Sequence, residues 1–282
     1  MISLNFSDNE IREQVLDFMR SLNCYPADNN NLILDGYIHR YKLKGDKSGE
    51  YSGAYCIYAD GVLPAGWVED WHSGKAITWH YDTTTLSQEQ RDYFNSDEFR
   101  KKSEAERNRR EKERQAKQAE AAERSRILWE ALKEAPGNHP YLKKKQVFPY
   151  GIRINSENKL AIPLRDINGN VKSIQWISPD GSKRFQPDTA LEGLFWSIGL
   201  DTLKPADFDG VILLGEGFAT MAKLYELTGK PCVAGISCYF MKSVAEAIMR
   251  HYPHARIIVM ADNDKVTEDR RGYNPGSEPS FD

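Results

Sequence analysis

Two short apolar runs that both end in carboxylates constrain this chain more than any other feature. Residues 211–215 (Val-Ile-Leu-Leu-Gly) lead into Glu216, and residues 256–261 (Arg-Ile-Ile-Val-Met-Ala) lead into Asp262 and Asp264. Short apolar runs rich in β-branched residues predict buried strands. A third apolar run at 232–236 lies between them, flanked by helical patterns at 219–228 and 241–251. Strands that alternate with helices predict a parallel sheet with both faces covered.

The predicted sheet brings the three carboxylates to an edge where ligands bind. In open sheets of this kind, ligands bind beyond the carboxyl ends of the strands. Residues two apart in a strand share a side, so Asp262 and Asp264 can face one ion, with Glu216 on the neighbouring strand end as a third group. Mg²⁺ requires few carboxylates when substrate phosphates complete its shell. Gly215 and Gly217 allow a tight turn and a close approach of a phosphate. The alternative is that these acids cap helices or end strands without any chemistry.

Composition limits the partners of the chain. With 38 Lys and Arg against 41 Asp and Glu, no global attraction to nucleic acid exists, so any basic surface is local. The four cysteines lack paired metal-ligand spacing and are typical of reduced thiols in a cytosolic protein. The sequence contains no apolar run as long as a membrane span and no signal-peptide pattern. We therefore expect a cytoplasmic protein with no membrane partner.

The N-terminal part combines one helix with a small sheet. Ser7 and Glu10 match a capping box, and apolar residues at helical spacing predict a helix over 8–22. Aromatic and β-branched runs between 32 and 81, separated by turn residues, predict an antiparallel sheet. Trp67 and Trp71 are candidates for stacking on the bases of a single strand, beside basic residues at 39, 40 and 42. The alternative is that the aromatics form a core and the charges face solvent.

A charged stretch separates this part from a second β-rich region. Residues 100–126 contain 11 Lys or Arg and 6 Glu without Gly or Pro, which predicts a long exposed helix. This helix is either a linker or a basic arm that contacts phosphates. Beyond it, the runs 160–164 and 171–177 predict a hairpin-like pair. Three cations in or near these strands, Lys172, Lys183 and Arg184, are candidates for holding phosphates. A solvated surface is the alternative.

Residues 210–264 resemble the Toprim domain of bacterial primases, topoisomerases and some nucleases. The resemblance is carried by the strand leading to Gly-Glu-Gly at 215–217, the following helix and strands, and Asp-Asn-Asp at 262–264. The preceding segment, with Ile-Pro-Leu at 162–164, Ser-Lys-Arg-Phe at 182–185 and Leu-Phe-Trp at 194–196, is similar to the primase subdomain that precedes Toprim. Among such proteins, the chain resembles the primase-like proteins of conjugative plasmids, phages and other mobile elements.

The resemblance implies an α+β fold in four parts. These are a β-rich accessory domain (1–86), a long charged helix or linker (87–136), a primase-type catalytic subdomain (137–205) and a Toprim domain (206–282). The Toprim part looks C-terminally incomplete, because the family continues past Asp-x-Asp with a further helix, strand and acidic residues. The family's zinc-binding module is also missing, because the cysteine spacing excludes it. Template recognition would then depend on the N-terminal module or on a partner.

The resemblance also implies an activity. It implies Mg²⁺- or Mn²⁺-dependent synthesis of RNA primers from ribonucleoside triphosphates on single-stranded DNA, with a replicative helicase as a further partner. Glu216 would act as general base or metal ligand, and Asp262 and Asp264 as metal ligands. Two alternatives stay open. One is a Toprim nuclease that uses the same carboxylates, and the other is a non-catalytic nucleic-acid-binding or interaction protein with a degenerate Toprim fold.

Overall fold

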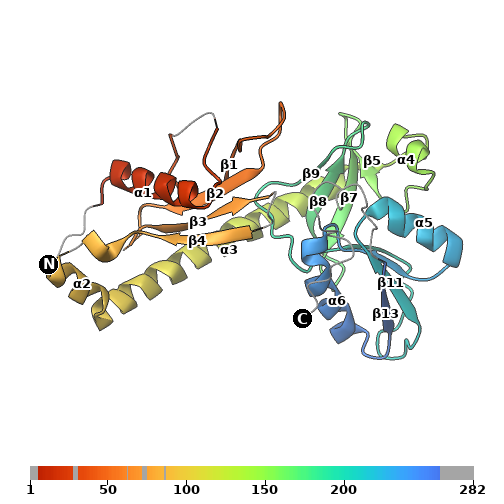
Figure 1. Cartoon of the computed structure of the whole chain (residues 1–282). Helices are drawn as coiled ribbons and strands as arrows, with labels where there is room; N and C mark the ends of the chain where they lie inside the picture. Colours follow the sequence, from red (N-terminus) through yellow and green to blue (C-terminus); the bar gives the residue numbers. More distant parts are fainter. Residues whose placement is uncertain (1–5, 28–30, 62, 72–74, 86, 261–282) are drawn as a thin grey trace. The chain divides into compact units, whose positions relative to one another are not determined.

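The chain divides into two compact units, and the boundary between them lies within one long helix. The computed structural model describes residues 6–27, 31–61, 63–71, 75–85 and 87–260. The units are Met1–Lys112 and Glu113–Asp282, so their boundary falls within helix α3 (Asp97–Ala131). The structure mixes helices and antiparallel and parallel strands, which confirms the α+β class (Figure 1). In the described ranges, no helix is both long and apolar enough to cross a membrane.

The first unit is a four-stranded antiparallel sheet with helix α1 (Asp8–Ser21) on one face. As predicted, the helix begins with a capping box, in which the Ser7 hydroxyl accepts the Glu10 backbone N–H at 3.3 Å and the Glu10 carboxylate accepts that of Ser7 at 3.0 Å. The strands pair in sequence order. They are β1 (His39–Tyr41), β2 (Gly53–Tyr58), β3 (Ala65–Asp70) and β4 (Lys75–His80). The sheet is as expected, but β3 was not predicted as a strand.

Strand alternation divides the residues of this sheet between a core face and an open face. Tyr55, Ile57 and Val68 point to the α1 face, where they form one core with α1 residues such as Ile11 and Val15. The opposite face carries the intervening side chains, which the register aligns in rows across the strands. One row is Arg40, Ala54, Glu69 and Ala76, and the next is Cys56, Trp67 and Thr78.

The charged region forms two helices where one was predicted. Helix α2 (Gln88–Phe94) starts with a capping box between Ser87 and Gln90 and ends at Asn95. The Ser96 hydroxyl then accepts the Phe99 N–H at 3.2 Å, and α3 begins. A serine that caps a new helix start competes with continuation of the old helix. A single-turn helix, η1 (Thr83–Thr85), precedes α2.

The second unit begins with a five-stranded antiparallel sheet. Its strands pair in sequence order. They are β5 (Lys133–Glu134), β6 (Arg153–Ile154), β7 (Leu160–Arg165), β8 (Val171–Ile177) and β9 (Lys183–Phe185). The predicted hairpin is β7–β8, in which Gly169 has a positive φ of 84°. A short helix, α4 (Pro140–Lys145), precedes β6. In its first turn, the Tyr141 backbone N–H donates to Nδ1 of the buried His139 at 3.2 Å.

The remaining strands form the sheet that the two apolar runs predicted. Its order is β10 (Trp196–Ile198), β12 (Cys232–Ala234), β11 (Val211–Gly215) and β13 (Arg256–Met260). Strand β11 is parallel to both β12 and β13, and β10 is antiparallel to β12. Helices follow two of the strands: α5 (Phe218–Thr228) after β11, and α6 (Met241–His251), preceded by η2 (Cys238–Phe240), after β12.

Both faces of this second sheet are covered, as the alternation of strands and helices predicted. On one face, Leu213 packs with Phe218 and Met221 of α5 and with Leu160 and Ile162 of β7. A separate core contains Ile212, Leu214 and the α6 residues Val244 and Ile248. The two sheets therefore share a hydrophobic core, and β10 joins a sheet whose other strands follow residue 205. The predicted boundary at 205/206 divides residues that share one sheet and one core.

Candidate functional site

Glu216 lies in the turn that joins β11 to α5, at the carboxyl edge of the second sheet. The central strand β11 ends at Gly215, and Gly217 is the N-cap of α5 with an extended backbone (φ −109°, ψ 142°) and no side-chain cap. The first-turn amides of a helix lack intrahelical partners and carry a partial positive charge. Glu216 is partly buried. The carboxylate therefore lies beside a helix start whose amides suit an anion, and its role in holding a metal ion stays a prediction.

Strand β13 reaches the same edge beside β11. The register pairs Val211 with Arg256 and ends with Gly215 opposite Met260. Asp262 and Asp264 follow this strand, but they lie outside the described residues. Among the residues described, no group of three His, Cys, Asp or Glu side chains is arranged to hold a metal ion. The three-carboxylate site thus stays a prediction, of which the structure describes Glu216.

The two glycines beside Glu216 have different surroundings. A Cβ on Gly215 would overlap the Met221 Sδ atom and lie 3.3 Å from the Met260 carbonyl oxygen. Among the described residues, a Cβ on Gly217 would come within 4 Å of the Thr220 hydroxyl alone, at 3.9 Å. Packing alone accounts for the glycine at 215, whereas the described residues leave space for a side chain at 217. A role for either glycine in binding phosphate stays a prediction.

The three candidate phosphate-binding cations are spread over both faces of the five-stranded sheet. Lys172 in β8 lies 3.8 Å from the Asp166 carboxylate. Lys183 and Arg184 are exposed neighbours in the edge strand β9, so their side chains point to opposite faces. Register places Arg184 beside Trp176, on the face where Trp129 of α3 packs, and Lys183 beside Ile177, on the face of the shared core. Of the three, Lys183 is on the side of the second sheet.

In the first unit, both candidate stacking residues lie on the open face of the sheet. Trp67 is partly buried between its register partners Cys56 and Thr78. Trp71 follows β3 directly and is 40% exposed, with the Arg40 guanidinium 3.3 Å from its ring centroid. Part of the predicted basic and aromatic face, Arg40 and Trp71, is therefore present, whereas His39 lies on the opposite face, where its ring stacks on the core residue Tyr55. Its binding function is not tested by this arrangement alone.

A cleft in the second unit was not predicted from the sequence. It has a volume of about 540 Å³, and its lining includes Arg165, Asp201 and His251 but not Glu216. Arg165 donates to the Gly169 carbonyl oxygen at 2.7 Å, and its guanidinium lies 5.7 Å from the Trp129 ring. Burial lowers the pKa of the Arg165 guanidinium, and the charge of Asp201 opposes that effect. The sequence signal was an arginine that ends an apolar strand, which is too common a pattern to single out.

Comparison with known proteins gives the chain its relatives. No protein-family model matches it. Among solved structures, the primase fragment of the bacteriophage T7 primase-helicase protein aligns with a TM-score of 0.36 and 20% identity, over 46% of this chain and 56% of that chain. The DnaG primase catalytic domain bound to ssDNA aligns with a TM-score of 0.38 and 14% identity, over 56% of this chain and 65% of that chain. Likeness at this level carries no argument about the site or the activity.

The sequence relatives cover nearly the whole chain. One is a protein named DNA primase TraC of Escherichia coli, which is 29% identical over 279 residues, or 94% of this chain and 24% of the relative. A second protein of that name and organism is 30% identical over 274 residues, or 95% of this chain and 18% of the relative. The resemblance to primase-like proteins of mobile elements is therefore confirmed. It spans no more than about a quarter of the length of these TraC relatives.

Proposed function

We propose that this chain is the primer-synthesising part of a mobile-element primase, which joins ribonucleoside triphosphates into RNA on a single-stranded DNA template. The observation that carries this proposal is the similarity to DNA primase TraC over 94% of the chain. The position of Glu216 at the carboxyl edge of a parallel sheet supports it, because ligands of such sheets bind at that edge. A Toprim-type identity for the second sheet belongs to the same proposal.

Glu216, Asp262 and Asp264 would hold Mg²⁺ or Mn²⁺. The donor set fits, because carboxylate oxygens are the ligands that these hard cations prefer. The backbone is compatible with the grouping, because Gly215 and Met260 are register partners and the chain can span at most about 7 Å from Met260 to Asp262 and about 14 Å to Asp264. Bound there, the ion would stabilise negative charge on the reacting phosphate.

The residues of the chain would bind and orient the reactants. In nucleotidyl transfer, the primer 3′-hydroxyl oxygen bonds to the α-phosphorus, the bond to the β-phosphate bridging oxygen breaks, and pyrophosphate leaves. Glu216 would accept the hydroxyl proton, as a general base in hydrogen-bond reach of it. The free amides at the start of α5 and the Lys183 ammonium are suited to phosphate oxygens. Lys172 and Arg184 would contact the nucleic-acid backbone from the other face.

Two alternatives differ from primer synthesis in a measurable way. A Toprim nuclease would use the same carboxylates to cut DNA without nucleotides. A non-catalytic nucleic-acid-binding protein would do neither. The similarity to proteins named DNA primase favours primer synthesis over both. The boundaries at residues 86 and 136, action in the cytoplasm and a helicase partner are expectations of the same proposal.

The test is primer synthesis on single-stranded DNA with labelled ribonucleoside triphosphates and Mg²⁺ or Mn²⁺. The variant with both Asp262→Ala and Asp264→Ala should lose at least about a hundredfold in rate, because losing a metal clamp removes several kcal/mol of transition-state stabilisation. Its DNA affinity should stay within about twofold. Glu246→Gln, an exposed residue of α6, is the matched control. Equal synthesis by the double variant, or nicking of labelled DNA without nucleotides, would contradict the proposal.

A further inference from the structure

The first unit carries a cluster of exposed side chains at one edge of its sheet, here called the edge patch and formed by Arg40, Tyr51 and Trp71. Arg40 is the central residue of the edge strand β1, and its guanidinium lies 3.3 Å from the Trp71 ring centroid. The same guanidinium donates to the Tyr51 carbonyl oxygen at 3.2 Å. The Trp71 N–H donates to the Ser52 carbonyl oxygen at 2.9 Å, which fixes the tryptophan backbone beside the start of β2.

The aromatic residues of the edge patch are not needed for the core of the unit. That core lies on the α1 face, whereas strand alternation puts Arg40 and Trp71 on the opposite face. Tyr51 is 56% exposed and Trp71 is 40% exposed. Two neighbouring residues before β1, Tyr37 and Ile38, are 60% and 66% exposed. An exposed tryptophan in contact with an arginine on the same open face is a candidate binding surface.

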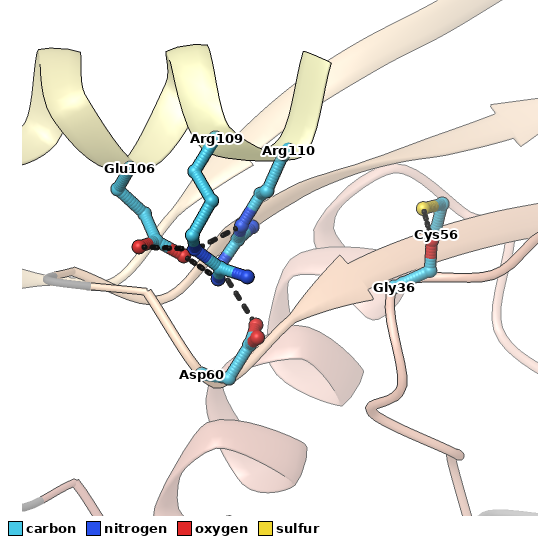
Figure 2. A network of polar contacts seen from close by, with 6 residues as sticks. All are labelled: Gly36, Cys56, Asp60, Glu106, Arg109 and Arg110. Carbon is cyan, nitrogen blue, oxygen red and sulfur yellow. Dashed lines mark hydrogen bonds and ion pairs between the residues drawn. The ribbon is translucent and has the colours of Figure 1, made fainter. Parts of the chain in front are cut away.

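The opposite end of the open face is covered. Figure 2 shows Arg110 of α3 reaching Asp60, at the turn after β2, with Glu106 on its other side. The Arg110 guanidinium also lies 4.6 Å from the Tyr58 ring centroid. Tyr58, on the same face as Arg40, is therefore in contact with an element of its own unit. Among the described residues, no comparable element is recorded over Trp71.

The segment that carries Arg40 and Tyr51 has a surplus of cations, whereas Glu69 and Asp70 precede Trp71. Residues 37–51 contain four cations, Arg40, Lys42, Lys44 and Lys47, and two carboxylates. Both carboxylates accept backbone N–H groups of the loop: Asp46 from Leu43 and Ser52, and Glu50 from Lys47. Within the part of the chain that the structure describes, no carboxylate oxygen pairs with Arg40 at salt-bridge distance, and Glu69 affects it only at longer range. The Arg40 guanidinium and the exposed Lys44 and Lys47 can thus face an anionic partner.

We propose that the edge patch binds single-stranded nucleic acid, with bases stacked on Tyr51, Trp71 and the Arg40 guanidinium and phosphates held by Lys44 and Lys47. Aromatic platforms beside cations bind single strands with little sequence preference, because every base has a π-face. Arginine planes serve as stacking surfaces in the same way. A protein strand that paired with the edge strand β1 would not use these aromatic rings and cations in this way. The inference rests on the proposed primase function only for the choice of DNA as the probe.

The test measures binding of the full chain to a fluorescein-labelled 15-nucleotide oligothymidine by anisotropy in EDTA. Excluding metal separates this test from the proposed catalysis, which needs it. Trp71→Ala and Tyr51→Ala should each weaken the affinity about five- to thirtyfold, as loss of a stacked base does. Arg40→Ala should weaken it to a similar degree, because a stacking surface is lost. Lys44→Ala should reduce the slope of log affinity against log salt by about 0.7, since one phosphate contact is lost. Duplex DNA should bind more weakly than the single strand.

Matched variants keep the test decisive. Phe148→Ala removes an exposed aromatic of the second unit, and Arg91→Ala removes an exposed cation of α2. Both should bind within about twofold of the wild type. Trp71→Phe should keep the affinity within about threefold, which distinguishes stacking from a folding defect in Trp71→Ala. Unchanged affinity in both Trp71→Ala and Tyr51→Ala, or a preference for duplex DNA, would overturn the proposal. An affinity lost only on substitution of Lys183 would assign the strand to the second unit and overturn it as well.

Discussion

Gly215 and Met260 are register partners at the carboxyl ends of two neighbouring parallel strands. The chain leaves both strands at one edge of the sheet, with Glu216 following the first and Asp262 two residues after the second. The same pairing crowds Gly215, because a Cβ there would overlap the Met221 thioether and lie 3.3 Å from the Met260 carbonyl oxygen. One backbone relationship therefore explains a glycine and supports the grouping of the carboxylates.

Gly215→Ala should destabilise the second unit by about 1–3 kcal/mol, because a methyl group there overpacks the contact with Met221 and Met260. Gly217→Ser is the control, since it has free space, a negative φ and an N-cap position that favours serine. Urea unfolding followed by tryptophan fluorescence measures both. If Gly215→Ala costs no more than Gly217→Ser, packing is not the reason for the glycine.

Glu226 should make the stability of the second unit sensitive to acid. Its pKa lies below the ordinary value of 4.5, because Lys223 donates to it at 2.8 Å and the Phe148 N–H at 3.1 Å. A lowered folded-state pKa contributes stability that is present above the ordinary value and is lost as the pH falls through the folded value. Glu226→Gln should cost about 1 kcal/mol at pH 7. The difference from wild type should shrink between about pH 5 and pH 3.

Unfolding titrations at several pH values measure this effect. Glu246→Gln, an exposed carboxylate of α6, should run parallel to the wild type across the same range. A difference between wild type and Glu226→Gln that stays constant from pH 7 to pH 3 would show that the carboxylate does not stabilise this unit through its charge.

Arg110 should stabilise the first unit through its ring contact more than through its ion pair. Asp60 is largely exposed, so its 2.7 Å pair with Arg110 should show a coupling energy of only about 0.5 kcal/mol in a double-mutant cycle. Arg110→Ala should cost about 1–2 kcal/mol, since it also removes the stacking on Tyr58. Arg107→Ala, in the exposed part of the same helix, should be neutral. A coupling energy equal to the whole cost of Arg110→Ala would reverse this ranking.

Local signals in the sequence predicted the regular elements well. The capping box at Ser7, the helical patterns that became α5 and α6, and the apolar runs that became β11 and β13 all lie within a residue or two of the observed bounds. Each of these signals is contained in the element it predicts. Periodicity and capping chemistry are therefore sufficient for such elements.

Elements that depend on distant partners were missed. Strand β3 contains Gly66, which is required because a Cβ there would collide with the Cys56 carbonyl oxygen of the paired strand, and the glycine weakened the strand signal. Strand β10 has three residues and pairs with β12, more than thirty residues away. Helix α4 differs from these strands, because its start has a local signal, a histidine N-cap followed by proline.

The candidate site divides in the same way. The position of Glu216 could be predicted, because a carboxylate that directly follows a buried strand lies at the edge of the sheet. Lys183 and Arg184 point to opposite faces of the sheet, which could not be predicted without knowing that both lie in a strand. The contact between Arg40 and Trp71 joins residues 31 positions apart and follows only from the register of β1, β2 and β3.

Binding of Mn²⁺, followed by electron paramagnetic resonance of the free ion, tests the central claim most directly. The account predicts one site per chain, weakened at least about tenfold by Glu216→Gln and by the double variant Asp262→Asn with Asp264→Asn, because each change removes a charged oxygen ligand. Glu246→Gln should bind as the wild type does. Equal Mn²⁺ affinity and stoichiometry in all four proteins would contradict a metal site at the shared edge of β11 and β13.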